Sequence, residues 1–219
     1  MDTVSTAKAK NPLVAYASKW TGLSRTSPDN RPVQPPLPQV FVSTVVSFLS
    51  ILIVNVINQR LDFINGPLSN ESSILIGSIG ASAVLLYHAH ESPLSQPSNV
   101  LWGHVLSAVI GVSISKLFNV DALVAYKSTY APPLGVALSI AIMALTNTVH
   151  PPGGATALIA ITGSSEIQNL GYGFVLRPVL TGVLAMLVCA LVFNNLDSTR
   201  RYPKFWIQRY SYSFSSSNK

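Results

Sequence analysis

The sequence predicts an all-α integral membrane protein with six membrane-embedded helical segments. Three observations lead to this class. Of the 219 residues, 48% are hydrophobic and only 10% are charged, whereas about 25% of a soluble domain is charged. The mean hydropathy is +0.40. Apolar runs long enough to enter or span a bilayer recur along the chain, and one small-residue pattern occurs twice.

The charge distribution predicts three regions and an orientation. Residues 1–39 form a basic, proline-rich N-terminal tail with net charge +3, and residues 196–219 form a basic C-terminal tail with net charge +4. The domain between them, 40–195, has net charge −1. Because positive residues flank membrane segments on the cytosolic side, we expect both termini there, with the lipid bilayer rather than nucleic acid as partner. A transit peptide is the alternative reading of the first tail.

Six apolar runs follow one another between the tails, separated by polar connections. The first is about 18 residues long and can span a bilayer, whereas the second and fifth are short or broken. An Asn-Gly-Pro turn interrupts the polar connection after the first run. The expected segments cover residues 40–57, 74–87, 101–118, 134–149, 152–162 and 174–193.

The stretch 150–155, His-Pro-Pro-Gly-Gly-Ala, is the expected helix break. Proline lacks an N–H and disfavours helical dihedrals in the residue before it, here His150, yet it is tolerated in the first turn of a new helix. We expect the backbone N–H groups of Gly153, Gly154 and Ala155 to be unpaired donors at the positive end of that helix. Broken backbone survives in a membrane only where protein or water satisfies it, which makes this stretch the candidate site.

The small-residue pattern suggests an internal repeat. Gly80-Ala81-Ser82-Ala83 recurs 74 residues later as Gly154-Ala155-Thr156-Ala157, each time within the middle of three segments. The chain therefore reads as two repeats, about 40–118 and 134–193, and matched breaks of this kind are a feature of transporter binding sites. The repeats are inverted if all segments cross and parallel if the short ones re-enter. Chance similarity among the small residues common at membrane helix interfaces is the alternative.

Other candidate residues carry weaker signals. No nucleophile–base pair, phosphate loop or zinc-protease motif occurs, so we expect neither an enzyme nor a cofactor. The cluster His88, His90 and Glu91 is more typical of a solvated helix end than of a metal site. Cys189 lies in an apolar run and is expected to be filler. His104 lies inside an apolar segment, where it either bonds a carbonyl or takes part in proton movement.

The nine residues from His150 to Leu158 resemble the signature of the HPP family of integral membrane proteins. The resemblance covers about residues 37–206. Members in plants and cyanobacteria are linked to nitrite transport, so the resemblance implies an HPP-type transmembrane domain and a small-anion transporter. Four further blocks resemble the family: Gly80–Leu86, Glu91–Pro97, Gly103–Ala108 and Phe193–Leu196.

We therefore expect a transporter or channel for a small monovalent anion, with nitrite favoured and homo-oligomerisation compatible with the size. Backbone and hydroxyl donors would bind the ion without a fixed charge that traps it. A membrane scaffold whose breaks serve only close packing is the alternative. His150 and His104 are candidates for proton movement. The expected anion-binding residues are His150, Gly153, Gly154, Ala155, Thr156, Ser78, Gly80, Ala81 and Ser82.

Overall fold

The computed structural model describes residues 35–65, 76–197 and 200–207, and within these ranges the chain is helical with no strand. The N-terminal tail up to residue 34 and the expected turn after Asn65 lie outside the described residues. The long helices are α2 (Leu37–Asn65), α4 (Pro97–Leu117), α5 (Lys127–Leu145) and α8 (Thr181–Leu196). The shorter ones are α3 (Gly77–Ala83), η2 (Val84–His88), η3 (Pro93–Ser95), η4 (Val124–Tyr126), α6 (Pro151–Thr162), α7 (Ser165–Asn169) and η5 (Val175–Leu180).

Four helical stretches are long and apolar enough to cross a membrane, which confirms the all-helical membrane class. They cover Leu37–Arg60, Pro97–Leu117, Val124–Leu145 and Val175–Leu196. The short helices α3 with η2 and α6 occupy the positions of the expected second and fifth segments. A three-segment repeat built from these elements stays a prediction.

Several helices extend beyond their apolar runs. The first begins at Leu37, because Pro38 fits a first helical turn, and it continues past Ile57 through polar residues that favour helix. We expected a loop up to residue 133, but α5 already begins at Lys127 and contains Pro132 and Pro133. Prolines are tolerated inside membrane helices where neighbouring groups satisfy the freed carbonyls.

The end of α5 differs from the prediction that the proline pair stops it. The helix ends at Leu145, and Asn147 adopts a left-handed conformation with φ of 55°. The Thr148 N–H donates to the Met143 carbonyl at 2.8 Å, and the Asn147 N–H donates to the Ala144 carbonyl at 3.2 Å. This is a Schellman cap, for which asparagine is a suitable residue. The extended stretch up to His150 then leads into α6.

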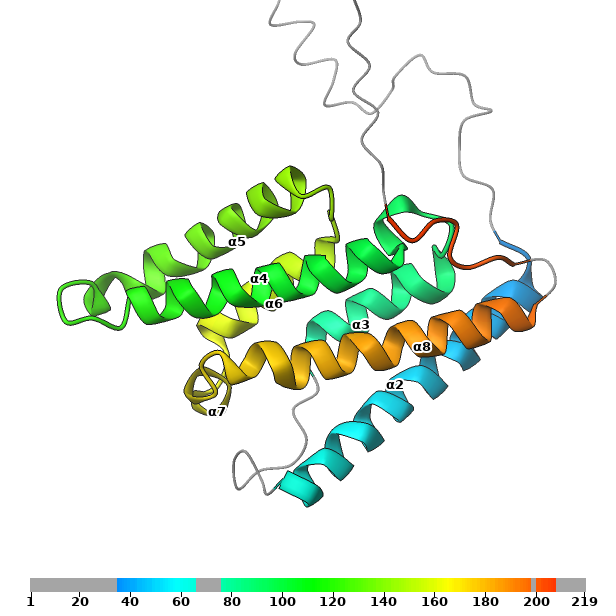
Figure 1. The fold of residues 1–219 in the computed structure, drawn as a ribbon, viewed down its shortest axis with the longest axis horizontal. Coiled ribbons are helices and arrows are strands. Elements are labelled where there is room, and N and C mark those ends of the chain that lie inside the picture. Colours follow the sequence, from blue (N-terminus) through cyan, green and yellow to red (C-terminus); the bar gives the residue numbers. More distant parts are fainter. Residues whose placement is uncertain (1–34, 66–75, 198–199, 208–219) are drawn as a thin grey trace, which may run out of the picture. The chain divides into compact units, whose positions relative to one another are not determined.

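The helices pack in two groups that meet at α3 and α6 (Figure 1). In one group α4 lies against both α5 and α6, and in the other α2 lies along α8. The short α3 contacts α2, α6 and α8. This arrangement buries one face of α3 and part of α6 between long helices, so the side chains of these faces meet away from the surface.

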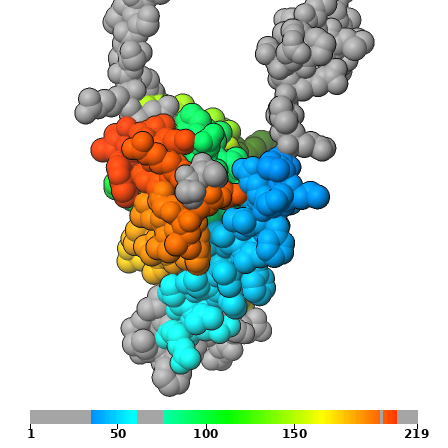
Figure 2. Space-filling model, turned by 90° about the vertical axis from the view of Figure 1, so that its right-hand side faces the viewer, coloured from blue at the N-terminus to red at the C-terminus, as the bar shows by residue number. Residues whose placement is uncertain are grey.

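The start of α2, the loop 89–96 and residues 200–207 lie together, and we call this the terminal end. The guanidinium of Arg200 donates to the carbonyls of Tyr87 and Gln39 at 3.2 and 3.4 Å and to Ser43 Oγ at 3.2 Å. Tyr202 donates to the Ser95 carbonyl at 2.8 Å. Figure 2 shows the surface of α2 and α8, with the segment from residue 200 on the end of α8.

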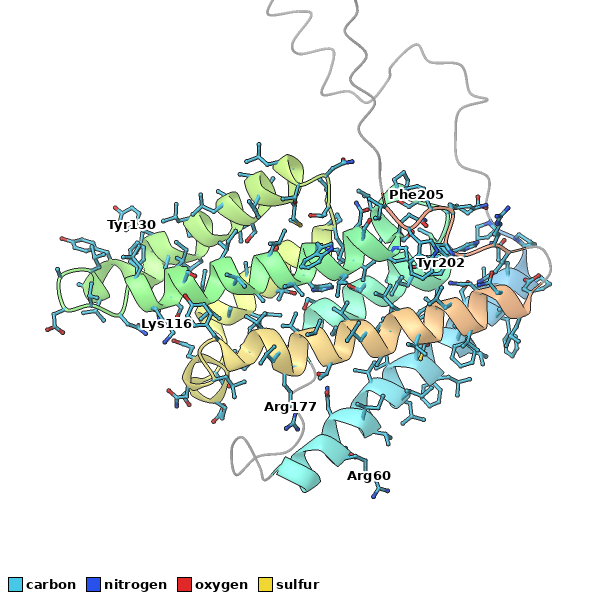
Figure 3. The ribbon with its side chains drawn as sticks, viewed as in Figure 1. Arg60, Lys116, Tyr130, Arg177, Tyr202 and Phe205 are labelled. Carbon is cyan, nitrogen blue, oxygen red and sulfur yellow. The ribbon has the colours of Figure 1, made fainter. Side chains whose placement is uncertain are left out.

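The opposite end contains the Lys127 ammonium, which donates to Asn119 Oδ1 and Gln168 Oε1 at 2.8 and 2.7 Å. Lys116 and Tyr130 lie toward this end, whereas Tyr202 and Phe205 lie at the terminal end (Figure 3). The chain therefore runs toward the terminal end along α3 and η2 and away from it along α6. The two short helices have opposite directions.

The interface of α4 with α6 depends on small residues. Gly103, Ser107 and Gly111 are spaced four residues apart on one face of α4, a spacing that lets membrane helices approach closely. A Cβ at Gly111 would lie 2.6 Å from the Ala157 carbonyl oxygen, and one at Gly153 would overlap the Gly103 carbonyl. Gly154, in contrast, would place a Cβ only against Val136 Cγ1 at 3.9 Å.

We predict that Gly153→Ala lowers the free energy of unfolding by about 1–3 kcal/mol, because the methyl group forces α6 away from the α4 backbone. Gly154→Ala is the matched control, with an expected change below about 0.5 kcal/mol. Thermal unfolding of both variants in the same detergent measures the difference. Equal stability of the two variants would contradict the close contact at Gly153.

Candidate functional site

Five buried polar side chains form one continuous hydrogen-bonded chain between α3, α4 and α6, which we call the histidine–hydroxyl chain. Its members are at most 1% exposed. Hydroxyls and imidazoles in an apolar membrane interior are expensive unless bonded, and they mark functional sites by default. The members are Ser78 and Ser82 of α3, His104 of α4, His150 at the start of α6 and Thr156 of α6.

The histidine–hydroxyl chain begins at the Leu94 carbonyl, which lies 2.8 Å from His150 Nδ1. Ser82 Oγ lies between the two rings, 2.9 Å from His150 Nε2 and 2.7 Å from His104 Nε2. His104 Nδ1 lies 2.7 Å from Thr156 Oγ1, whose hydroxyl donates to Ser78 Oγ at 2.8 Å. The ring centroids are 4.9 Å apart. One hydroxyl therefore bridges two imidazoles.

The local sequence explains how these groups meet. His150 has extended dihedrals, φ −142° and ψ 102°, as expected before Pro151, and its ring therefore turns out of the axis of α6. Gly103 leaves room for it, because a Cβ there would lie 2.6 Å from His150 Cβ. Ser78 and Ser82 are one turn apart and so share a face of α3. The non-helical stretch between α5 and α6 thus places His150 beside its hydrogen-bond partners.

The expectation of three unpaired donors after the prolines is wrong. The Gly153 N–H donates to the His150 carbonyl at 2.8 Å. The next two amides, of Gly154 and Ala155, reach the carbonyls of His150 and Pro151 by ordinary helical spacing. The prolines occupy the positions whose N–H groups would have been orphans, so they remove donors rather than expose them. Anion binding at these three residues stays a prediction, but unpaired backbone N–H groups no longer support it.

The remaining predicted residues lie outside the histidine–hydroxyl chain, and three of them line grooves between helices. Gly80 lines a groove of about 520 Å³ between α2 and α3, and the neighbouring Ala81 is exposed. Gly154 and Ala155 line an apolar groove of about 490 Å³ between α5 and α6. The structure therefore brings together Ser78, Ser82, His104, His150 and Thr156, and it places the other five predicted residues around them or outside.

Sequence reasoning missed three groups near the site. The Leu94 carbonyl holds His150, Asn99 Nδ2 donates to the Val149 carbonyl at 3.0 Å, and Ser107 lies beside Gly153. Ser107 Oγ is buried with no hydrogen-bond partner among the described residues. Ser107 follows His104 by three positions and so shares its helix face, a spacing that could have identified it.

The His88, His90 and Glu91 cluster lies at the terminal end. Glu91 pairs with Lys204 at 2.7 Å, and this bond lowers the pKa of the exposed carboxyl. Burial, followed by the nearby Arg200, lowers the pKa of His90. Across the described ranges, no group of three His, Cys, Asp or Glu residues is placed to hold a metal ion. The cluster attaches residues 200–207 to the loop 89–96.

Comparison with known proteins identifies the family of this region. Residues 32–203 match the HPP transmembrane region. One curated transmembrane protein of Dictyostelium discoideum is 40% identical over 196 residues, which is 89% of this chain and 64% of that protein. A second is 37% identical over 195 residues, 89% of this chain and 58% of that protein. The chain thus spans less than two thirds of either relative. No solved structure matches it.

We predict that Thr156→Val lowers the free energy of unfolding by about 1–2 kcal/mol, because His104 Nδ1 and Ser78 Oγ lose their shared partner while the side-chain volume is kept. Thr162→Val in the same helix is the control, since the Thr162 hydroxyl is exposed and, among the described residues, bonds only the Leu158 carbonyl of its own helix at 2.9 Å. Thermal unfolding compares the two. A Thr156 variant as stable as the Thr162 variant would show that the buried contacts do not stabilise the fold.

Proposed function

The chain belongs to the HPP family of integral membrane proteins, and from that premise we propose that it transports a small monovalent anion, with nitrite the favoured substrate. The histidine–hydroxyl chain is the observation that carries the proposal. It supplies hydroxyl and imidazole donors and contains no carboxylate that would repel an anion. It also contains no lysine or arginine, whose permanent charge would hold the ion too long for passage.

To bind, the ion must replace hydrogen bonds that the members of the histidine–hydroxyl chain make with one another. Ser82 lies at the centre, with bonds to both imidazoles. An anion inserted between Ser82 Oγ and the rings would face the Ser82 hydroxyl and both Nε2 atoms, which donate to it when they carry hydrogens. Ser107 Oγ, buried and without a partner among the described residues, is a further donor on the same face of α4.

We also propose that two inverted three-segment repeats surround this site, α2 to α4 and α5 to α8. The opposite directions of α3 and α6 support inversion over parallel repeats. The two grooves are a second support, because Gly80 and Val84 line one and their counterparts Gly154 and Leu158 line the other. Opening of one repeat and then the other would expose the site first to one side and then to the other.

Both termini are proposed to face the cytosol. Arg200, which follows the last helix, bonds Gln39 and Ser43 at the start of the first helix, so both ends of the described domain lie on one side. The tails that continue from these ends carry net charges of +3 and +4. Positive residues of this kind favour the cytosolic side.

Uptake of nitrite, nitrate, chloride and bicarbonate into vesicles that contain the purified full chain tests the proposal. We expect saturable nitrite uptake above that of protein-free vesicles. Ser82→Ala removes the central hydroxyl and is expected to reduce uptake about tenfold, the equivalent of one hydrogen bond to an ion.

Ser139→Ala is the matched control, because Ser139 Oγ is equally buried but, within the described part of the chain, bonds only the Gly135 carbonyl of α5. Its uptake should stay within about twofold of the unmodified chain. A folded protein that carries none of the four anions would contradict transport and favour the scaffold alternative.

A further inference from the structure

We infer that the histidine–hydroxyl chain binds one proton, which His104 and His150 share through Ser82, and that this proton travels with the anion. The co-transport part rests on the proposed function, whereas the single-proton site does not. The inference comes from counting hydrogens along the contacts of the chain.

The contacts at the two ends of the histidine–hydroxyl chain determine which ring nitrogen of each histidine carries a hydrogen. A carbonyl only accepts, so the contact of His150 Nδ1 with the Leu94 carbonyl requires the hydrogen on Nδ1. At the other end, the Thr156 hydroxyl has two acceptors, Ser78 Oγ at 2.8 Å and the Pro152 carbonyl at 3.3 Å. Thr156 has no second hydrogen, so its contact with His104 requires a hydrogen on His104 Nδ1.

The centre of the chain is then one hydrogen short. A neutral imidazole carries one ring hydrogen, and both rings have placed theirs on Nδ1. Two bare Nε2 atoms therefore face Ser82 Oγ at 2.7 and 2.9 Å, and its single hydrogen also has the Ser78 carbonyl as an acceptor at 3.1 Å. One added proton on either Nε2 completes both ring contacts, whereas a second would place two positive charges on buried rings whose centroids are 4.9 Å apart, which is strongly unfavourable. Such a pair takes up its proton as a unit.

The neutral pair has a different arrangement that also satisfies both rings. Thr156 turns its hydrogen from Ser78 to His104 Nδ1, His104 carries its hydrogen on Nε2 and donates to Ser82, and Ser82 donates to His150. The bond from Thr156 to Ser78, which joins α6 to α3, then reverses, with the Ser78 hydroxyl as the donor. Proton binding is thereby linked to the direction of a hydrogen bond between the two short helices.

The surrounding elements supply no counter-charge for the added proton. The groups that titrate on elements packed against α4 and α6 are Lys127 and Tyr130 of α5, Glu166 of α7, Arg177 of η5 and Cys189 of α8. Lys116 lies at the far end of α4 itself, and Tyr87 and His88 belong to η2, which continues α3. His90 and Glu91 lie in the loop that carries Leu94.

Neither carboxylate of this set balances the histidine pair. Glu91 pairs with Lys204 at the terminal end, and Glu166 lies beyond the end of α6 that is remote from His150. A buried, unbalanced positive charge is strongly unfavourable. A monovalent anion at Ser82 would neutralise it, so proton and anion bind together in a one-to-one ratio.

Nitrogen NMR of the full chain labelled with ¹⁵N-histidine tests the proton site without transport. His104→Gln and His150→Gln assign the resonances. We expect opposite tautomers at alkaline pH, with the hydrogen on Nδ1 of His150 and on Nε2 of His104. On acidification, one positive charge should appear over the pair, and His104 Nδ1 should gain a hydrogen.

Ser82→Ala should uncouple the two rings so that they titrate separately, and Ser139→Ala should leave the pair unchanged. Identical tautomers in both rings, a full charge on each, or a pair that stays neutral down to the pH of unfolding would overturn the single-proton site.

Vesicle uptake separates this inference from the proposed function. A pH difference of one unit, acidic outside, should concentrate nitrite inside about tenfold at one-to-one coupling, beyond the level in protein-free vesicles. Uptake that ignores the pH difference would overturn coupling and leave transport intact. Absence of uptake together with the expected NMR titration would overturn transport and leave the proton site intact.

Discussion

The close contact of α4 with α6 is the constraint on which the rest of the structure depends. Lipid tails are as apolar as leucine, so membrane helices associate through packing and hydrogen bonds rather than through hydrophobic burial. Glycines at 103, 111 and 153 bring the two backbones together. That distance in turn lets His104 and Thr156 reach one another at 2.7 Å. Packing and polar bonding therefore stabilise the same interface.

Much of the fold could be predicted from the sequence, because apolar runs and small residues report directly on membrane helices. The two short helices and the membership of Ser82, His150 and Thr156 in one site follow from the pattern. The end of α5 could not be located, because Pro151 and Pro152 are the stronger helix-stop signal and the asparagine cap at Asn147 comes four residues before them. The partnership of His104 with Ser82 depends on the approach of α4 to α3, which no local pattern encodes.

The role assigned to the glycine pair changed for a physical reason. In a helix that begins with two prolines, the first backbone N–H groups after the prolines already donate to carbonyls of preceding residues. The two glycines therefore contribute few unpaired donors. Gly153 is needed for the close packing of α6 on α4, whereas the hydrogen-bond donors of the site are hydroxyl and imidazole side chains. In the proposed function, the anion would bind to hydroxyls and imidazoles, groups that carry no permanent charge and can therefore release it.

The most direct measurement of the central claim is the response of the imidazole nitrogens to nitrite in the labelled full chain. The account predicts saturable shifts at His104 and His150, with those of His88 and His90 unchanged, because Ser82 lies between the first pair. Shifts confined to His88 and His90, or no shift at any histidine at concentrations that support uptake, would contradict it.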